Sequence, residues 1–195
     1  MDATTLLSRL QSLVPEARIE VAPSVDMPTL FVAREHIVDV ARALRETPGL
    51  DYTVLVELTA ADYLPREPRF EVIYQCLSLG LADFPRPSGN GPAARARLKV
   101  QVPGDDPRVP TVAGIWTNAN WLEREVIDLY GLTFDGHPDP RRLIMPEDWD
   151  GHPLRKDYPV QVHLPVATGQ AIQVTEADFL ENIARQRAFT ARRGE

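Results

Sequence analysis

Cysteine is almost absent from the sequence, because the 195-residue chain contains only Cys76. One thiol cannot form a disulfide within the chain, and it cannot by itself hold an iron–sulfur cluster or a structural zinc ion. A reducing compartment is therefore the natural setting. Cys76 falls on the inward positions of an alternating pattern, where a buried and unreactive thiol is the usual outcome. A redox role for Cys76 or Tyr74 is the weaker interpretation.

Long apolar runs and excess positive charge are also missing. No stretch approaches the roughly 18–20 consecutive apolar residues of a membrane helix, and the N-terminus lacks the basic and apolar regions of a secretory signal. The formal net charge is −7, which argues against nucleic-acid binding because such domains carry a basic stripe. No glycine-rich phosphate loop follows an expected strand, so a dinucleotide site is not supported.

Residues 1–104 show the alternating patterns of a small core domain. Apolar residues at helical spacing predict two helices, over residues 4–14 and 35–46. Alternating or β-branched runs predict strands over residues 18–21, 29–32, 52–58, 70–76 and 94–102. The last strand has one polar face, as antiparallel strands do, and residues 83–93 are typical of a turn or loop. We expect an α+β fold, with a small, mostly antiparallel sheet covered by helices on one face.

Proline is the clear excess, with 18 residues, and it recurs every few positions between Pro138 and Pro165. Proline removes a backbone donor and disfavours helix at the preceding residue. We therefore divide the chain into a core domain (1–104), a connecting segment (105–135) and an extended proline-rich tail (136–195) that ends in a possible helix. An extended tail cannot bury enough of itself to offset its ordering entropy, so we expect it to lie on a partner protein.

A charged helix is predicted just before the tail. Asn120 can cap it, Glu123 completes a capping box, and Gly131 can end it. Its acidic and basic side chains are expected on the face opposite the apolar residues. The residues that we predict to contact a partner are Glu123, Arg124, Glu125, Asp128, His137, Arg141, Arg142, Trp149, His152, Arg155, Lys156, Asp157 and Tyr158.

The two histidines of the tail allow a second interpretation. His137 and His152 each stand in a Gly-His-Pro unit followed by basic residues. Together with Asp157 they could form the metal site of a metal-assisted hydrolase. The alternative is a histidine that hydrogen-bonds and orients a tight turn, which the surrounding prolines favour.

Three ordered motifs closely resemble the family of the thirty-kilodalton-type subunit (the C subunit) of respiratory complex I, the proton-pumping NADH:quinone oxidoreductase. The first is EREVIDLYG at residues 123–131. The second combines GHP at 136–138 with the arginine pair at 141–142, and the third is GHPLRKDYP at 151–159. DDPRVPT at residues 105–111 also looks familial, so the resemblance covers about residues 105–159.

The resemblance implies a non-catalytic structural subunit of the peripheral arm that supports assembly of the quinone-reducing module. It implies packing against the forty-nine-kilodalton-type and twenty-kilodalton-type subunits and contact with the large iron–sulfur subunit. No cofactor is expected in this chain, because FMN, the iron–sulfur clusters and quinone would be held by other subunits. Membrane association would be indirect and peripheral, on the cytoplasmic side of the bacterial cell membrane. The equivalent subunit of a membrane-bound hydrogenase-type complex is the alternative.

Overall fold

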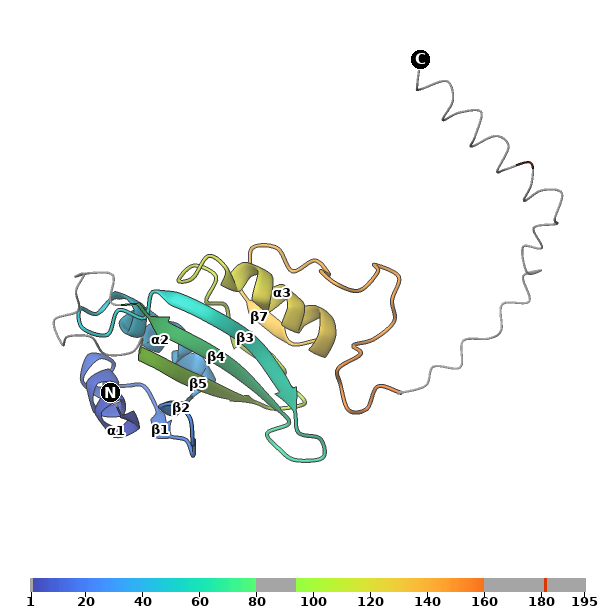
Figure 1. Cartoon of the computed structure of the whole chain (residues 1–195). Helices are drawn as coiled ribbons and strands as arrows, with labels where there is room; N and C mark the ends of the chain where they lie inside the picture. The colour runs from blue at the N-terminus through green and yellow to red at the C-terminus, as the bar shows by residue number, and fades with distance from the viewer. Residues whose placement is uncertain (1, 80–93, 160–180, 182–195) are drawn as a thin grey trace, which may run out of the picture. The chain divides into compact units, whose positions relative to one another are not determined.

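A five-stranded sheet forms the framework of the protein (Figure 1). The structure, a computed structural model, describes residues 2–79, 94–159 and 181. The described residues up to 159 belong to one compact unit, the first of two into which the chain divides. The main sheet and the helices that cover it belong to the first unit. The segments that the sequence divides at residues 104 and 135 lie together in this unit as far as residue 159.

The sheet has the strand order β1-β2-β5-β4-β3. Its strands are β1 (Ile19–Val21), β2 (Thr29–Val32), β3 (Val54–Asp62), β4 (Phe70–Ser78) and β5 (Ala94–Val102). All neighbours pair antiparallel except β2 and β5, which are parallel. The expected mostly antiparallel sheet is thus confirmed, but β5 is not a purely antiparallel strand. A parallel pair needs a long crossover connection, which α2, β3 and β4 provide here.

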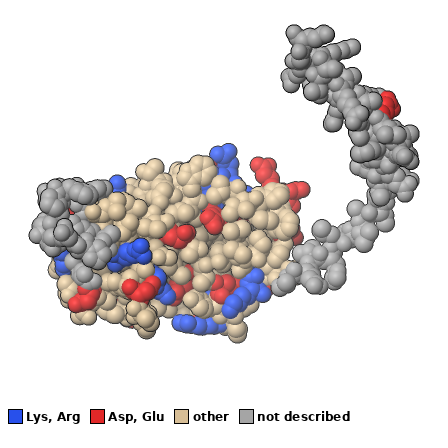
Figure 2. Space-filling model, in the orientation of Figure 1, with Lys and Arg blue, Asp and Glu red and all other residues tan. Residues whose placement is uncertain are grey.

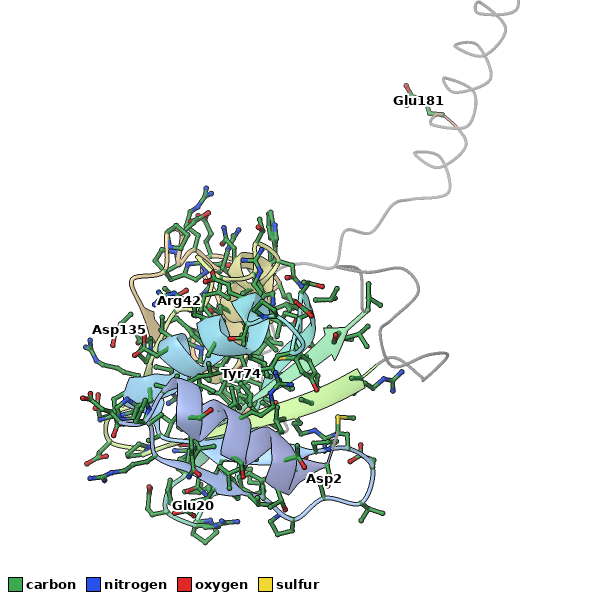
Figure 3. The ribbon with its side chains drawn as sticks, turned by 90° about the vertical axis from the view of Figure 1, so that its left-hand side faces the viewer. Asp2, Glu20, Arg42, Tyr74, Asp135 and Glu181 are labelled. Atoms are coloured by element: carbon green, nitrogen blue, oxygen red, sulfur yellow. The ribbon has the colours of Figure 1, made fainter. Side chains whose placement is uncertain are left out.

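Helices cover one face of this sheet, as predicted. They are α1 (Ala3–Leu13), α2 (Ile37–Glu46), which follows the short 3-10 helix η1 (Arg34–His36), and α3 (Ala119–Tyr130). A single apolar core joins all three helices to the same alternating face of β3, β4 and β5. Tyr74 pairs with Leu58 and Leu98 across the central strands, and it lies at the centre of the unit (Figure 3).

The predicted elements agree with the structure except at two places. Residues 4–14 and 35–46 correspond to α1 and to η1 with α2. The strand expected from residue 52 begins instead at Val54, because Asp51 has a positive φ of 51° and Tyr52 still donates to the carbonyl of Leu44. Residues 83–93 and the possible C-terminal helix lie outside the described residues, apart from Glu181. No helix in the described ranges is both long and apolar enough to cross a membrane.

The start of α3 also differs from the prediction. Asn118, not Asn120, occupies the N-cap position, and its side chain donates to the carbonyl of Leu55 at 2.7 Å. The predicted capping box is therefore wrong. The carboxylate of Glu123 points into the protein instead, where it accepts from Val112 N at 2.7 Å. Gly131 ends the helix as expected, in the left-handed conformation with φ 68°.

A second, two-stranded sheet joins the segment before α3 to the segment after it. It pairs β6 (Arg108–Pro110) with β7 (Thr133–Asp135) in parallel. Since α3 lies between these two strands in the chain, their pairing closes a loop around the helix. The chain that enters α3 and the chain that leaves it are thereby fixed side by side.

The buried hydroxyl of Tyr74 gives a first testable prediction. It has no hydrogen-bond partner among the described residues, and such a group costs free energy. We expect Tyr74→Phe to leave the free energy of unfolding unchanged or to raise it by up to about 1 kcal/mol. Leu98→Ala at the paired position is the control, with an expected loss of about 2–5 kcal/mol. Urea unfolding of both variants provides the measurement, and a loss above about 1 kcal/mol in Tyr74→Phe would contradict the unpaired hydroxyl.

Candidate functional site

The charged side of α3 is buried rather than exposed. Glu123, Arg124 and Asp128 are all buried in the described unit. Arg124 and Asp128 are covered because the chain after β7 folds back over this side of the helix, as the orange segment beside α3 shows in Figure 1. Glu123 bonds instead to Thr111 and Val112, which precede the helix. We call residues 136–159 the clasp. Its contacts with α3 form the candidate site.

Asp128 of α3 is the main anchor for the clasp. Its carboxylate accepts four hydrogen bonds, from the Arg142 guanidinium at 2.8 Å and from the backbone N–H groups of Leu143, Ile144 and Met145 at 2.7–3.0 Å. Burial alone would raise the pKa of Asp128, but these donors outweigh it and hold the pKa below its ordinary value. A buried carboxylate with this many donors is a strong and directional anchor.

Arg124 fixes the same stretch of the clasp one turn earlier. Its guanidinium donates to the carbonyls of Arg141 at 2.9 Å and Arg142 at 3.0 Å. The charged group also lies over the ring of Trp121, 4.9 Å from the ring centre. Arg124 and Asp128 therefore bind successive parts of the clasp, one through its carbonyls and the other through its amides.

The C-terminal end of α3 is satisfied by the GHPLRKDYP motif. A helix leaves its last four carbonyls without partners inside the helix. Here the carbonyl of Asp128 pairs with His152 Nδ1 at 2.8 Å, and that of Leu129 accepts from Leu154 N at 3.0 Å. The carbonyl of Tyr130 accepts from Arg155 Nε. Positive charge at this end also complements the helix dipole.

An ion-pair cluster joins the end of the clasp to the main sheet. Arg69 contacts Asp62 at 2.7 Å and Asp157 at 2.8 Å. Asp62 also accepts from the backbone N–H of Lys156 at 2.9 Å. Burial opposes the charge of Asp62, but Arg69 and the backbone donors hold its pKa well below the ordinary value. Arg69 likewise lowers the pKa of Asp157. The clasp is therefore tied to the end of β3 and to the residue that precedes β4, as well as to α3.

The histidines have separate partners. The Nδ1 atom of His137 accepts from Asp139 N at 3.0 Å, so Nε2 carries the hydrogen and donates to the carbonyl of Asn120 at 3.0 Å. His152 is held on α3 and Asp157 on Arg69. Within the described ranges, no group of three or more His, Cys, Asp or Glu side chains is arranged to hold a metal ion. The geometry does not bring together the residues of the hydrolase hypothesis, and it matches the turn-orienting role instead.

Burial strongly changes two further titratable groups. Glu123 is completely buried, and burial raises its pKa to about 7 despite the hydrogen bonds from Thr111 and Val112. Burial raises the pKa of Cys76 to about 12. Cys76 is therefore a protonated thiol, and its weak nucleophilicity supports the inert interpretation.

The remaining predicted contact residues take different positions. Arg141 is exposed and pairs with Asp139, and Tyr158 packs against Gly151, where an added Cβ would lie 2.9 Å from its ring. The side chains of Trp149 and Lys156 face outward, and Glu125 is half-buried. Contact with a partner stays a prediction for all of these residues. The sequence did not single out Asp62 or Arg69, which lie far from α3 in the chain and carry no local signal. Thr111 belongs to the DDPRVPT stretch, but nothing in the sequence indicated that its hydroxyl donates to Glu123.

Comparison with known proteins agrees with this geometry. The family model described as "Respiratory-chain NADH dehydrogenase, 30 Kd subunit" matches residues 30–163, which include the main sheet from β2 onward, α3 and the clasp. The chain therefore belongs to this subunit family of the respiratory-chain NADH dehydrogenase. The resemblance of the motifs at residues 105–159 is confirmed, and the match extends toward the N-terminus.

Three curated relatives illustrate the similarity. The C subunit of NADH-quinone oxidoreductase from Roseiflexus sp. (strain RS-1) is 44% identical over 82% of this chain and 86% of its own length. Its counterpart from Geobacter sulfurreducens is 48% identical over 68% of this chain and 75% of its own. NADH-quinone oxidoreductase subunit 5 of Thermus thermophilus is 40% identical over 78% of this chain and 73% of its own.

Two solved structures share the fold. The trypsin-resistant fragment (1-134) of Nqo5 is 32% identical, covers 71% of this chain and 99% of its own, and superposes with a TM-score of 0.52. A chain of the membrane-bound sulfane sulfur reductase, an archaeal respiratory membrane complex, covers 80% of this chain and 85% of its own with a TM-score of 0.63. At 24% identity the second likeness concerns the fold alone.

Gly131 provides a test of the clasp. An added Cβ would overlap the ring of His152 and lie 2.7 Å from Arg155, and the φ of 68° is itself unfavourable for other residues. We expect Gly131→Ala to lower the free energy of unfolding by about 2–4 kcal/mol and to speed tryptic cleavage after Arg155. Gly114→Ala is the matched control, since its Cβ meets nothing within 4 Å. Equal losses in the two variants would show that the clasp does not depend on this close approach.

Glu123 couples folding to pH. Its pKa is about 7 in the folded chain and 4.5 as an ordinary side chain. Between these values the folded chain retains a proton that the unfolded chain releases. Stability therefore falls as pH rises through this window, by up to about 3 kcal/mol at roughly 1.4 kcal/mol per pH unit. Glu123→Gln imitates the protonated form. We expect this variant to lose the decrease in the free energy of unfolding between about pH 5 and about pH 8, as measured by urea unfolding.

Glu125→Gln is the control for this pH effect, because it removes the same charge from a half-buried side chain on the same helix. Asp128 does not interfere, since its pKa is lowered from 3.8 and its stabilisation is lost only as pH falls below the window. A pH dependence that is the same in Glu123→Gln and the wild type would refute the coupling.

Proposed function

We propose that this chain is a structural subunit of the peripheral arm of a proton-pumping NADH:quinone oxidoreductase. In this role it supports assembly of the quinone-reducing module and carries out no reaction itself. The observation on which this rests is that the family match spans the residues that build the clasp. The relatives over this region are named as subunits of NADH-quinone oxidoreductase.

The exposed apolar side chains around the clasp support a docking role. Trp121 is 58% exposed, Ile144 55% and Leu154 48%. All three lie on or next to α3: Trp121 is part of the helix, and the backbone amides of Ile144 and Leu154 donate to Asp128 and Leu129. Grouped apolar side chains on a surface are typical of protein interfaces.

The clasp also explains how a proline-rich segment can present such a surface. Its backbone is held by Arg124, Asp128 and the last carbonyls of α3. A partner would then meet a preformed surface and would not have to order a free chain, which reduces the entropic cost of binding. The charged family motif therefore acts inside the subunit, and the exposed apolar residues act outside it.

The proposed partners are the forty-nine-kilodalton-type and twenty-kilodalton-type subunits, together with the large iron–sulfur subunit. We propose that FMN, the iron–sulfur clusters and quinone belong to those and other subunits, with none in this chain. The high pKa that burial gives to the Cys76 thiol is in keeping with this assignment. Attachment to the membrane would be indirect, on the cytoplasmic side of the bacterial cell membrane.

Affinity purification from gently solubilised membranes tests the proposal. We expect the tagged chain to recover the cluster-bearing subunits, and deletion of the chain to abolish NADH-dependent quinone reduction. A complex in which hydrogen-dependent electron flow is lost and NADH-dependent flow persists would indicate a hydrogenase-type assembly. Recovery of the tagged chain only as a free monomer would refute the structural role.

A further inference from the structure

The clasp carries a loop in which a tryptophan stands among carboxylates. We call residues 145–151, with the sequence MPEDWDG, the tryptophan loop. The side chain of Trp149 is 38% exposed, and those of Glu147, Asp148 and Asp150 are exposed as well. Figure 2 shows acidic side chains gathered at the end of the described unit where Figure 1 draws this part of the clasp.

The carboxylates of the tryptophan loop differ from the other acids of this site. Asp128 on α3 and Asp139 and Asp157 in the clasp each have an arginine partner in this chain. By contrast, the side chains of Asp148 and Asp150 make no hydrogen bond or ion pair with any residue that the structure describes. The loop therefore displays negative charge that the described part of the chain leaves unmatched.

Hydrogen bonds to its backbone hold the loop in place, so its side chains remain available to bind a partner. Arg142 donates to the carbonyl of Trp149 at 3.0 Å and to that of Gly151 at 3.3 Å. Trp149 N donates to the carbonyl of Pro146 at 3.1 Å. The same guanidinium is anchored on Asp128. These backbone contacts thus position the indole ring of Trp149 and the carboxylates of Asp148 and Asp150, and the side chains themselves take no part in them.

We propose that the tryptophan loop binds an arginine of a neighbouring subunit, with the guanidinium stacked on Trp149 and paired with Asp148 or Asp150. This inference rests on the proposed function, which supplies the neighbouring subunit. Arginine fits because its planar group both stacks on an indole and forms paired hydrogen bonds with carboxylates. The same chain contains such a stack, in which Arg124 lies over Trp121. Exposed apolar side chains of the clasp would supply further contacts.

The charge of the loop favours a protein partner over other surfaces. Anionic lipid headgroups attract basic segments and repel acidic ones, and nucleic-acid phosphates do the same. Tryptophan and arginine are the residues most enriched at the energetic centres of protein interfaces. Charge complementarity therefore points to a basic protein surface with an apolar part.

The test uses the full chain with an affinity tag, expressed in cells that lack the native copy. The variants are Asp148→Asn/Asp150→Asn and, separately, Trp149→Ala. Neither removes a hydrogen bond of the clasp, since Trp149 engages through its backbone. Glu16→Gln/Glu46→Gln removes the same number of charges from exposed positions outside the clasp. The amount of cluster-bearing subunits retained on the tagged chain is measured at about 50 mM and about 300 mM salt.

We expect each loop variant to retain about tenfold less of the partner at low salt, which corresponds to a loss of about 1.4 kcal/mol in binding free energy. Asp148→Asn/Asp150→Asn should also lose the salt dependence that the wild type and Glu16→Gln/Glu46→Gln show. Unchanged thermal unfolding of the loop variants would assign the loss to the interface. Trp149→Phe, which keeps an aromatic face, should restore part of the retention.

The outcomes separate the two proposals. If the wild-type chain retains the complex and the loop variants behave as the control does, the arginine contact is refuted and the structural role stands. If the wild-type chain retains nothing, the proposed function itself fails. A concentration-dependent dimer of the isolated chain that Trp149→Ala abolishes, seen by light scattering, would make a second copy the occupant and would overturn the assignment to a neighbouring subunit.

Discussion

The binding of the clasp by Asp128 is the interaction on which the rest of this region depends. A carboxylate removed from water is costly unless several donors reach it, and here the clasp supplies all four of them. Because three donors are successive backbone amides, the chain must follow one path at residues 143–145. That path then positions Arg142 for the tryptophan loop and directs the GHPLRKDYP motif toward the end of α3. One buried charge thus determines the course of a segment that has no helix or strand of its own.

The family motif at residues 123–131 and the exposed side chains around the clasp have different roles. EREVIDLYG is a conspicuous run of charges, yet Glu123, Arg124 and Asp128 act within the subunit. The exposed side chains left for a partner lie outside this motif, as Trp149 and Ile144 do. Charge in the interior gives directional contacts that select one arrangement of the clasp, and apolar groups at the surface give contact area. A proline-rich segment can then belong to the subunit's own structure and still serve as a docking surface.

The sequence predicts the fold well and the site only in part, for a physical reason. Periodicity is a local property, so the helices and most strands of residues 1–104 follow from it, and Gly131 is recognisable as a helix end. The partners of Glu123 and Asp128 are set by tertiary contacts that no local pattern reports. Arg69 illustrates the limit, since it pairs with Asp157, 88 residues further along the chain. From its sequence the charged helix face is therefore predicted to contact a partner, although the chain itself covers most of it.

The parallel pairing of β2 with β5 also determines when the sheet can form. All of α2, β3 and β4 must emerge from the ribosome before β2 meets its second neighbour, because that neighbour, β5, is the last strand of the main sheet in the chain. Until then β2 is paired only with β1, and β4 presents an open edge. Non-local pairing of this kind slows folding and leaves strand edges exposed. The N-terminal hairpin therefore completes its structure late, although it is synthesised first.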